Sequence, residues 1–278
     1  MTLNCRGRLL VLERPLVMGI LNVTPDSFSD GGLYLDPDRA LAHAAAMLRD
    51  GAAIIDIGGM SSRPGADIIP VADEMRRVLP VIQRIHKAFP EAILSIDTVH
   101  AEVADAAIEA GVSIINDISA GAIDPEITDV ALKHDAPYVL MHMRGTPADM
   151  QQQTDYEDVA LEVLDFLIAH ITKLREKGLE DIIVDPGFGF GKTLEQNYAL
   201  LARLHTFKIL EAPILVGLSR KSMIYKALDK QPDEVLAPLS ALHWMALEQG
   251  ARILRVHDVA PAMDVIRIYE IVQQTKTS

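Results

Sequence analysis

The feature that most constrains the fold is a repeat of short apolar runs, each ending in a polar residue and followed by a segment of helical character. The first run, Leu16 to Leu21, is unbroken, and Asn22 is the first polar side chain after it. This length suits a strand buried on both faces. Residues 23–32 then contain a proline, two glycines and short polar side chains, which indicates a polar loop after the strand. Loops of this kind commonly carry the chemistry of a scaffold.

The strand-then-helix pattern occurs eight times, with no linker or low-complexity segment. The predicted strands are residues 16–21, 53–57, 93–96, 113–115, 138–141, 182–184, 214–218 and 253–256, and the predicted helices are residues 37–49, 71–89, 101–110, 125–133, 158–177, 194–204, 238–248 and 262–272. Eight such units in about 250 residues match an α/β protein with a (β/α)8 TIM barrel. We predict a single domain over residues 1–278, with residues 1–14 as an N-terminal hairpin. A doubly wound sheet is the alternative, but residues 19–22 lack its glycine fingerprint.

The charge balance limits the class of partner. The chain has 26 Lys and Arg against 39 Asp and Glu, a formal charge of -13, which argues against nucleic acid or an anionic membrane as the main partner. A small anionic substrate stays possible where basic residues cluster. Cys5 is the only cysteine, which fits a reducing cytoplasm. No stretch is apolar enough to span a membrane and the N-terminus has no secretory signal, so we expect a cytoplasmic protein.

Polar side chains stand at the ends of the predicted strands. In a barrel the carboxyl ends of all strands lie on one face, so these side chains should surround one cavity. They are Asn22, Asp56, Asp97, Asn116, His142, Asp185, Lys221, Arg255 and His257. Each one alone could be a helix cap or a solvated loop residue, and we keep that interpretation for Asp56 and Asp117. That interpretation does not suit the nine side chains together, because desolvated charges are costly unless they are paired or held for a ligand.

Residues 19–32, GILNVTPDSFSDGG, and residues 56–65, DIGGMSSRPG, resemble the two signature segments of the dihydropteroate synthase family. The resemblance continues in order through residues 95–97, 115–118, 185–192, 219–222 and 255–258. It implies a pterin-binding barrel, usually a homodimer, that acts as a transferase in folate synthesis. The reaction would condense 6-hydroxymethyl-7,8-dihydropterin diphosphate with 4-aminobenzoate to give 7,8-dihydropteroate and pyrophosphate. Sulfonamides are expected to mimic 4-aminobenzoate in this family.

The chemistry of a pterin accounts for four of these residues. Its amino-pyrimidinone edge is rich in donors, and Asp185 can accept two hydrogen bonds from it in parallel. Asp97 and Asn116 would serve the remaining ring positions. Lys221 would donate to the pterin carbonyl or a ring nitrogen and offset the acidic pair.

The pyrophosphate leaving group accounts for a second group of residues. Bond breaking should be largely dissociative, because the electron-rich dihydropterin stabilises positive charge on its methylene carbon. Arg255 and His257 alternate along one strand and so point the same way. Together with Arg63, and with Mg2+ held by Asn22, they would stabilise the charge that grows on pyrophosphate. The catalytic residues would then be Arg63, Lys221, Arg255 and His257.

The resemblance places Phe28, Phe190 and Pro64 around the aminobenzoate ring, with Ser222 near its carboxylate. The full expected substrate-binding set is Asn22, Phe28, Ser62, Arg63, Pro64, Asp97, Asn116, Ile118, Met143, Asp185, Phe190, Lys221, Ser222, Arg255 and His257. The family often has Glu and Thr where this chain has Met60 and Ser62, which leaves open what position 60 does in loop closure. Residues 187–193, GFGFGKT, imitate a phosphate-binding loop, but that pattern needs glycine at Pro186, so we exclude an ATPase.

Three other functions compete. A pterin-binding methyltransferase module shares the barrel, but its folate substrate carries no diphosphate, so residues 219–221 and 255–257 argue against it. A metal-dependent barrel hydrolase normally has a His-x-His pair, which none of the nine histidines forms. A noncatalytic pterin-binding protein would release no pyrophosphate. We expect small-molecule partners, Mg2+ as cofactor, no nucleic acid and no membrane.

Overall fold

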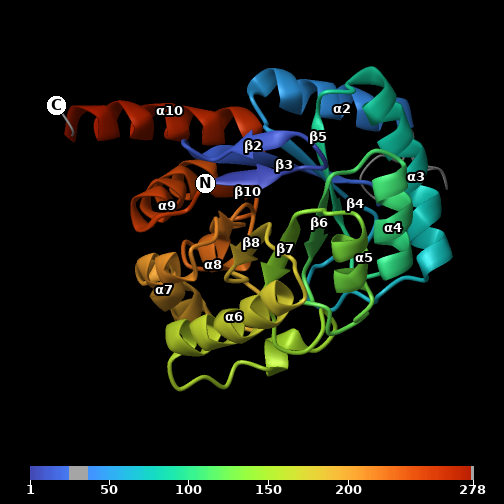
Figure 1. The fold of residues 1–278 in the computed structure, drawn as a ribbon. Helices are drawn as coiled ribbons and strands as arrows, with labels where there is room; N and C mark the ends of the chain where they lie inside the picture. Colours follow the sequence, from blue (N-terminus) through green and yellow to red (C-terminus); the bar gives the residue numbers. More distant parts are fainter. Residues whose placement is uncertain (25–36, 277–278) are drawn as a thin grey trace.

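The computed structural model describes residues 1–24 and 37–276. Within them, eight parallel strands form one sheet in the order β8-β7-β6-β5-β4-β3-β10-β9, and helices surround it (Figure 1). The strands are β3 (Leu16–Asn22), β4 (Ile54–Gly58), β5 (Ile93–Asp97), β6 (Ile114–Asp117), β7 (Tyr138–Met141), β8 (Ile182–Asp185), β9 (Leu215–Val216) and β10 (Ile253–Val256). A parallel bridge between Val184 and Ile214 joins the two edge strands and closes the barrel. The predicted (β/α)8 barrel is confirmed, and the open doubly wound sheet is excluded.

The helices follow the strands along the chain. They are α2 (Pro37–Asp50), α3 (Val71–Ala88), α4 (Ala101–Glu109), α5 (Ile127–Lys133), α6 (Val159–Glu176), α7 (Leu194–Ala202), α8 (Ser222–Tyr225), α9 (Leu236–Gln249) and α10 (Val259–Lys276), with 3-10 turns at Met150–Gln152 and Leu204–Leu210. α9 and α10 begin before the positions that we predicted. Pro238 and Pro261 both lie in a first turn, where a proline loses no intrahelical hydrogen bond, so neither proline marks the first residue of its helix. α8 was not predicted.

A hairpin fills the amino-terminal end of the barrel. β1 (Thr2–Asn4) pairs antiparallel with β2 (Leu9–Val11). Its inward side chains pack in one apolar cluster with those at the starts of the strands: Leu3, Cys5, Leu10, Leu12, Leu16, Met18, Ile54, Ile114, Val139, Ile183, Leu215 and Ile253. Burial raises the pKa of the Cys5 thiol to about 12. Because apolar side chains occupy this end, the polar inward side chains lie at the opposite, carboxyl end.

The outer faces of the strands pack against the surrounding helices in a second, larger apolar core. Among the described residues, no helix combines the length and the apolar character that crossing a membrane requires. The two cores together hold the strand ends in fixed positions, which a site built from several strands requires.

Candidate active site

Arg255, on β10, is the centre of a buried polar network. Its Nε donates to Asp56 Oδ2 at 2.7 Å and its Nη2 donates to Asp97 Oδ2 at 2.5 Å. Asn116 Nδ2 donates to the same Asp56 oxygen at 2.9 Å. Burial alone would lower the pKa of Arg255, but the carboxylates of Asp56 and Asp97 raise it. A permanent cation therefore joins the ends of three strands and fixes the orientation of Asp97.

Asp56 was expected to be a helix cap or a solvated loop residue, and that expectation was wrong. Its side chain is 0% exposed and accepts hydrogen bonds from Arg255 and Asn116. The physical reason is strand alternation. Asp56 lies on the same face of β4 as Ile54, whose side chain is in the barrel interior. Applying this period of two to the sequence would have placed Asp56 inside.

Asp117, next to Asn116, was also expected to be a helix cap or a solvated loop residue, but it is fully buried and holds a turn. Its carboxylate accepts the backbone N–H groups of Ser119 and Gly121, each at 2.7 Å, and the Tyr138 hydroxyl at 2.6 Å. Its two oxygens stabilise the turn after β6. Asp117 therefore does not contribute to the cavity at the carboxyl end.

Asp185, which is buried, and Lys221, which is half-buried, lie close enough for their charges to interact. The Gly187 N–H donates to Asp185 Oδ1 at 2.7 Å, while Lys221 Nζ donates to the carbonyl of Phe188. Burial raises the pKa of Asp185, and the Lys221 ammonium opposes that effect. Burial lowers the pKa of Lys221 to about 8, and the Asp185 carboxylate opposes it. The pair offers a strong acceptor and a strong donor within one desolvated space.

Two glycines leave room between these groups. A Cβ atom on Gly58 would lie 3.8 Å from Asn22 Oδ1 and 3.6 Å from Asp97 Oδ2. A Cβ atom on Gly217 would lie 3.8 Å from Lys221 Nζ. The polar ends of β3 and β5 therefore approach each other around Gly58, and the absence of side chains at both positions keeps the mouth of the barrel open.

An apolar cluster lies at the same end of the barrel. It contains Met60, Val99, Ile118, Met141, Met150 and Phe190, with Ile69, Ile123 and Met143 packed against it. Three predicted contact residues, Ile118, Met143 and Phe190, thus lie together. Lys221 Nζ is 4.7 Å from the centre of the Phe190 ring. Met60 is 8% exposed in this cluster, so apolar packing takes the place of the charge that the family often has there. Flexible methionines can adapt to a flat aromatic ligand.

His257 lies among cations just before the N-terminus of α10. Burial, together with the cations of Arg220, Arg255 and Arg63, lowers its pKa to about 4. Its backbone N–H donates to Ser219 Oγ at 3.3 Å. Arg220 also pairs with Asp258 at 3.1 Å, and Arg255 pairs with Asp56 and Asp97. The neutral imidazole, the exposed guanidinium of Arg63 and the helix N-terminus together favour a bound anion.

The predicted aminobenzoate walls come from several segments. Ser62 is half-buried, whereas Arg63 and Pro64 are exposed in the loop between β4 and α3. Ser222 begins α8, directly after Lys221. Phe28 lies outside the described residues, so its contact stays a prediction.

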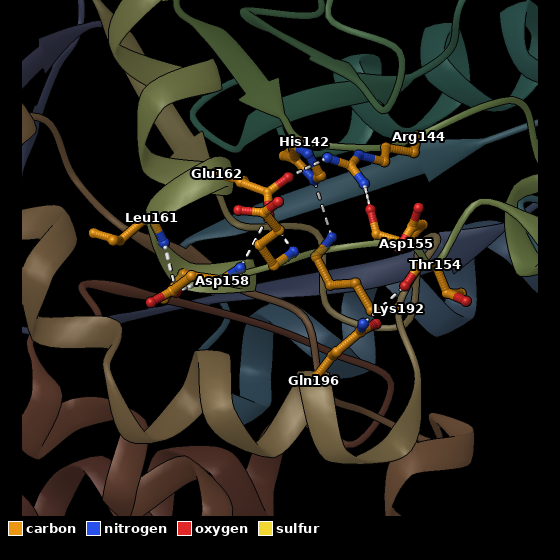
Figure 2. Close-up of polar contacts among 11 residues, drawn as sticks. His142, Arg144, Thr154, Asp155, Asp158, Leu161, Glu162, Lys192 and Gln196 are labelled. Atoms are coloured by element: carbon orange, nitrogen blue, oxygen red, sulfur yellow. Dashed lines mark hydrogen bonds and ion pairs between the residues drawn. The ribbon is translucent and has the colours of Figure 1, made fainter.

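His142 was expected to face the cavity, and the structure corrects this. Its ring packs edge-on against Phe166, with ring centres 4.8 Å apart, and its Nδ1 is 3.0 Å from Lys192 Nζ. Figure 2 shows the two side chains reaching toward each other. Met141, one residue earlier, packs in the apolar cluster at the mouth. Because neighbouring residues of a strand point to opposite faces, His142 points away from the cavity.

Asn22 is the predicted Mg2+ ligand. Among residues 1–24 and 37–276, no three His, Cys, Asp or Glu side chains gather as a metal site would require. Mg2+ usually keeps several waters and binds through one or two protein oxygens plus substrate phosphates. β3, which ends at Asn22, pairs with β10, which directly precedes His257. The amide oxygen of Asn22 therefore fits an ion that binds together with a diphosphate.

Known proteins are similar to this chain in sequence and in fold. The family described as pterin binding enzyme matches residues 18–257. Dihydropteroate synthase of Escherichia coli (strain K12) is 44% identical over 278 residues, which is 99% of this chain and 98% of that protein. The Xanthomonas albilineans dihydropteroate synthase structure with 4-aminobenzoic acid has a TM-score of 0.91 at 43% identity and covers 98% of both chains. The Yersinia pestis dihydropteroate synthase structure with a sulfonamide drug has a TM-score of 0.92 at 43% identity and covers 99% of this chain and 100% of that one. The chain therefore belongs to the dihydropteroate synthase family of pterin binding enzymes.

Proposed function

We propose that this chain condenses 6-hydroxymethyl-7,8-dihydropterin diphosphate with 4-aminobenzoate to give 7,8-dihydropteroate and pyrophosphate. The observation that carries the proposal is that a hydrogen-bonding site and a cationic site lie together at the carboxyl end of the barrel. Asp185 is a buried acceptor near the half-buried donor Lys221, and His257 lies within electrostatic reach of the guanidinium groups of Arg63, Arg220 and Arg255. A heteroaromatic ring with an anionic leaving group has complementary chemistry.

The pterin ring would lie between the polar network and the apolar cluster. Asp185 accepts from its amino-pyrimidinone edge, and Lys221 leaves the Phe188 carbonyl to donate to the ring carbonyl or nitrogen. Asp97 and Asn116 bind the remaining ring positions. Arg255 holds Asp97 in place through its Nη2, so its first contribution is to the pterin side of the site.

The pyrophosphate would leave toward His257 and Arg63, at the other side of the mouth. Bond breaking is largely dissociative, so these side chains stabilise charge that develops on the leaving oxygen. Asn22 would hold Mg2+, which would neutralise part of the diphosphate charge. An anion among these groups raises the low pKa of His257, so the imidazole becomes a stronger donor as pyrophosphate forms. The apolar cluster excludes water from the pterin cation.

The aminobenzoate amine then attacks the methylene carbon. Ser62, Arg63 and Pro64 from the loop after β4, with Ser222 and Phe190, surround its ring and carboxylate in this proposal. A sulfonamide has a similar aniline and would occupy the same place. The complex of the Yersinia pestis dihydropteroate synthase with a sulfonamide drug supports this part of the proposal.

We further propose a cytoplasmic homodimer. A lone, buried cysteine suits a reducing compartment. α9 and α10 expose Leu236, Ile268 and Ile271, which a partner subunit could cover. Analytical ultracentrifugation of the purified chain tests this, and a monomer at micromolar concentration contradicts it.

One assay tests the reaction. The protein is incubated with the dihydropterin diphosphate, 4-aminobenzoate and Mg2+, and dihydropteroate and pyrophosphate are measured by chromatography. Reactions that omit either substrate are the controls. Pyrophosphate release without dihydropteroate would indicate hydrolysis, and binding of intact folate without either product would favour the methyltransferase module.

A further inference from the structure

Lys192 is an enclosed lysine that the proposed reaction does not use. Its side chain is 3% exposed. Its Nζ donates to the carbonyls of Gly187 and Phe190, each at 2.9 Å, and to His142 Nδ1 at 3.0 Å. Burial lowers the pKa of Lys192, and the Asp185 carboxylate opposes that effect. As an ammonium group it has three N–H donors, and here each has an acceptor. The donors of Lys192 are therefore directed into the protein and not toward a ligand.

The loop after β8 winds around this ammonium. Gly187, Gly189 and Gly191 have φ values of 71°, 80° and 61°, so the backbone turns in a left-handed sense three times. Gly187 also lies so close to the His142 carbonyl that a Cβ atom would overlap its oxygen. The Gly187 carbonyl accepts from the Phe190 N–H at 3.2 Å, and the Gly189 carbonyl accepts from Gln151 Nε2 at 3.1 Å. The buried carbonyls of this loop lie in no sheet or helix ladder and need such donors. Lys192 supplies two of them from the inside of the loop.

The same loop carries much of the predicted pterin site. Asp185 precedes it, the Phe188 carbonyl accepts from Lys221, and Phe190 forms part of the apolar cluster. The Asp185 carboxylate itself accepts from the Gly187 N–H. A change in the path of the loop would therefore move the acceptor, the donor and the apolar wall of the pterin site together.

We propose that Lys192, held by His142, is a positioning residue that fixes the loop of residues 185–191 in its pterin-binding shape. The proposal rests on the proposed function, because it takes this loop as the pterin site. Lys192 acts through the Gly187 and Phe190 carbonyls and does not touch the reacting atoms.

His142 provides a rigid acceptor for this purpose. Its ring is packed against Phe166, and its backbone N–H donates to the Asp185 carbonyl at 3.0 Å, so β7 fixes the ring beside the loop. Arg144 is also held in place, since it lies 3.7 Å above the Tyr156 ring and pairs with Glu162 (Figure 2). A like charge on the imidazole would repel the ammonium, and burial together with the cations of Lys192 and Arg144 lowers the pKa of His142 to about 2. The imidazole therefore stays neutral, and in its Nε2–H form the Nδ1 lone pair accepts from Lys192.

The test is Lys192→Met, which keeps the length of the side chain and removes its donors. Calorimetry with 6-hydroxymethylpterin should show affinity at least about tenfold weaker than wild type, because two loop carbonyls lose a donor. Pyrophosphate with Mg2+ should bind within about twofold of wild type, since its predicted ligands lie on other strands. Lys226→Met, on an exposed lysine, is the control and should change neither affinity. Wild-type pterin affinity in folded Lys192→Met overturns the proposal, as does an equal loss for both ligands, which indicates general destabilisation.

The His142 variants give an independent measurement if Lys192→Met does not fold. Asparagine can place an oxygen near the position of Nδ1, whereas leucine cannot, so His142→Asn should bind the pterin more tightly than His142→Leu. Equal pterin affinity in these two variants overturns the proposal. If the wild-type protein binds no pterin, the proposed function itself fails, and the two failures are thereby distinguished.

Discussion

Asp185→Asn is the sharpest test of pterin recognition, because the structure fixes how the new amide would lie. In the native protein the Gly187 N–H donates to Asp185 Oδ1. An asparagine would keep its oxygen on that N–H and so turn its NH2 group toward the ligand. The pterin edge also presents donors, so two donors would face each other where an acceptor is needed.

The expected cost follows from two contributions. A hydrogen bond to a charged acceptor contributes about 1.5–3 kcal/mol, and a buried donor without a partner costs about 1–3 kcal/mol. Their combination predicts a loss of about 3 kcal/mol or more, or roughly 150-fold in the pterin dissociation constant. The fold itself should not weaken, because burial raises the pKa of Asp185 and the native environment already disfavours its charge.

Calorimetry with a pterin ligand, together with thermal unfolding, measures both quantities. Asp117→Asn is a matched control, since Asp117 is also a buried aspartate at a strand end, but its oxygens accept from Ser119, Gly121 and Tyr138. This control should lower the melting temperature and leave pterin affinity unchanged. Near wild-type affinity in Asp185→Asn would refute the assignment of Asp185 as the pterin acceptor.

Three further predictions address the other parts of the site. His257→Ala should weaken pyrophosphate binding and slow turnover by roughly tenfold or more, because one donor to the leaving group is lost; normal turnover at several Mg2+ concentrations would place the diphosphate elsewhere. Pterin affinity should fall as pH rises through about 8, because Lys221 must be protonated to donate and its pKa in the free protein is about 8. Calorimetric affinities that stay constant from about pH 7 to about pH 9.5 would contradict this prediction. Finally, 4-aminobenzoate should bind measurably only when pyrophosphate, Mg2+ and a pterin analogue are present. The predicted walls of its pocket include the glycine-containing loops of residues 23–35 and 58–70, which the other ligands would have to order. Equal affinity without those ligands would show that the pocket is preformed.

The barrel was predictable because its signal repeats. Each apolar run is too short for a helix of its own and is followed by a helical segment, so an error at one unit does not change the fold class. Strand β9 illustrates this. Residues 214–218 were predicted as a strand, but only Leu215–Val216 form one, with Ile214 adding a single bridge to β8. The unit still occupies its place in the barrel.

Side-chain partners were less predictable, because they depend on which face of a strand a residue occupies. Asp56 and His142 were both placed near predicted strand ends, yet the first lies within β4 and in the central network, and the second follows β7 and lies outside the network. Strand alternation could have separated them in the sequence. The contact between Lys192 and His142 could not have been inferred in this way, since 50 residues separate them and the loop path depends on tertiary packing.

The segment between β7 and α6 offers a physical reason for ordered binding. Gln151 Nε2 donates to the Gly189 carbonyl at 3.1 Å, and the Gly65 N–H donates to the Pro147 carbonyl at 2.9 Å. The same short segment thus contacts the loop that carries the predicted pterin site and the loop that carries Arg63. A ligand that orders one loop also fixes the surface on which the other rests. Each contact is a single hydrogen bond worth about 1 kcal/mol, and coupling between sites of about 1–3 kcal/mol is typical of proteins, so even this limited contact can bias the order in which the substrates bind.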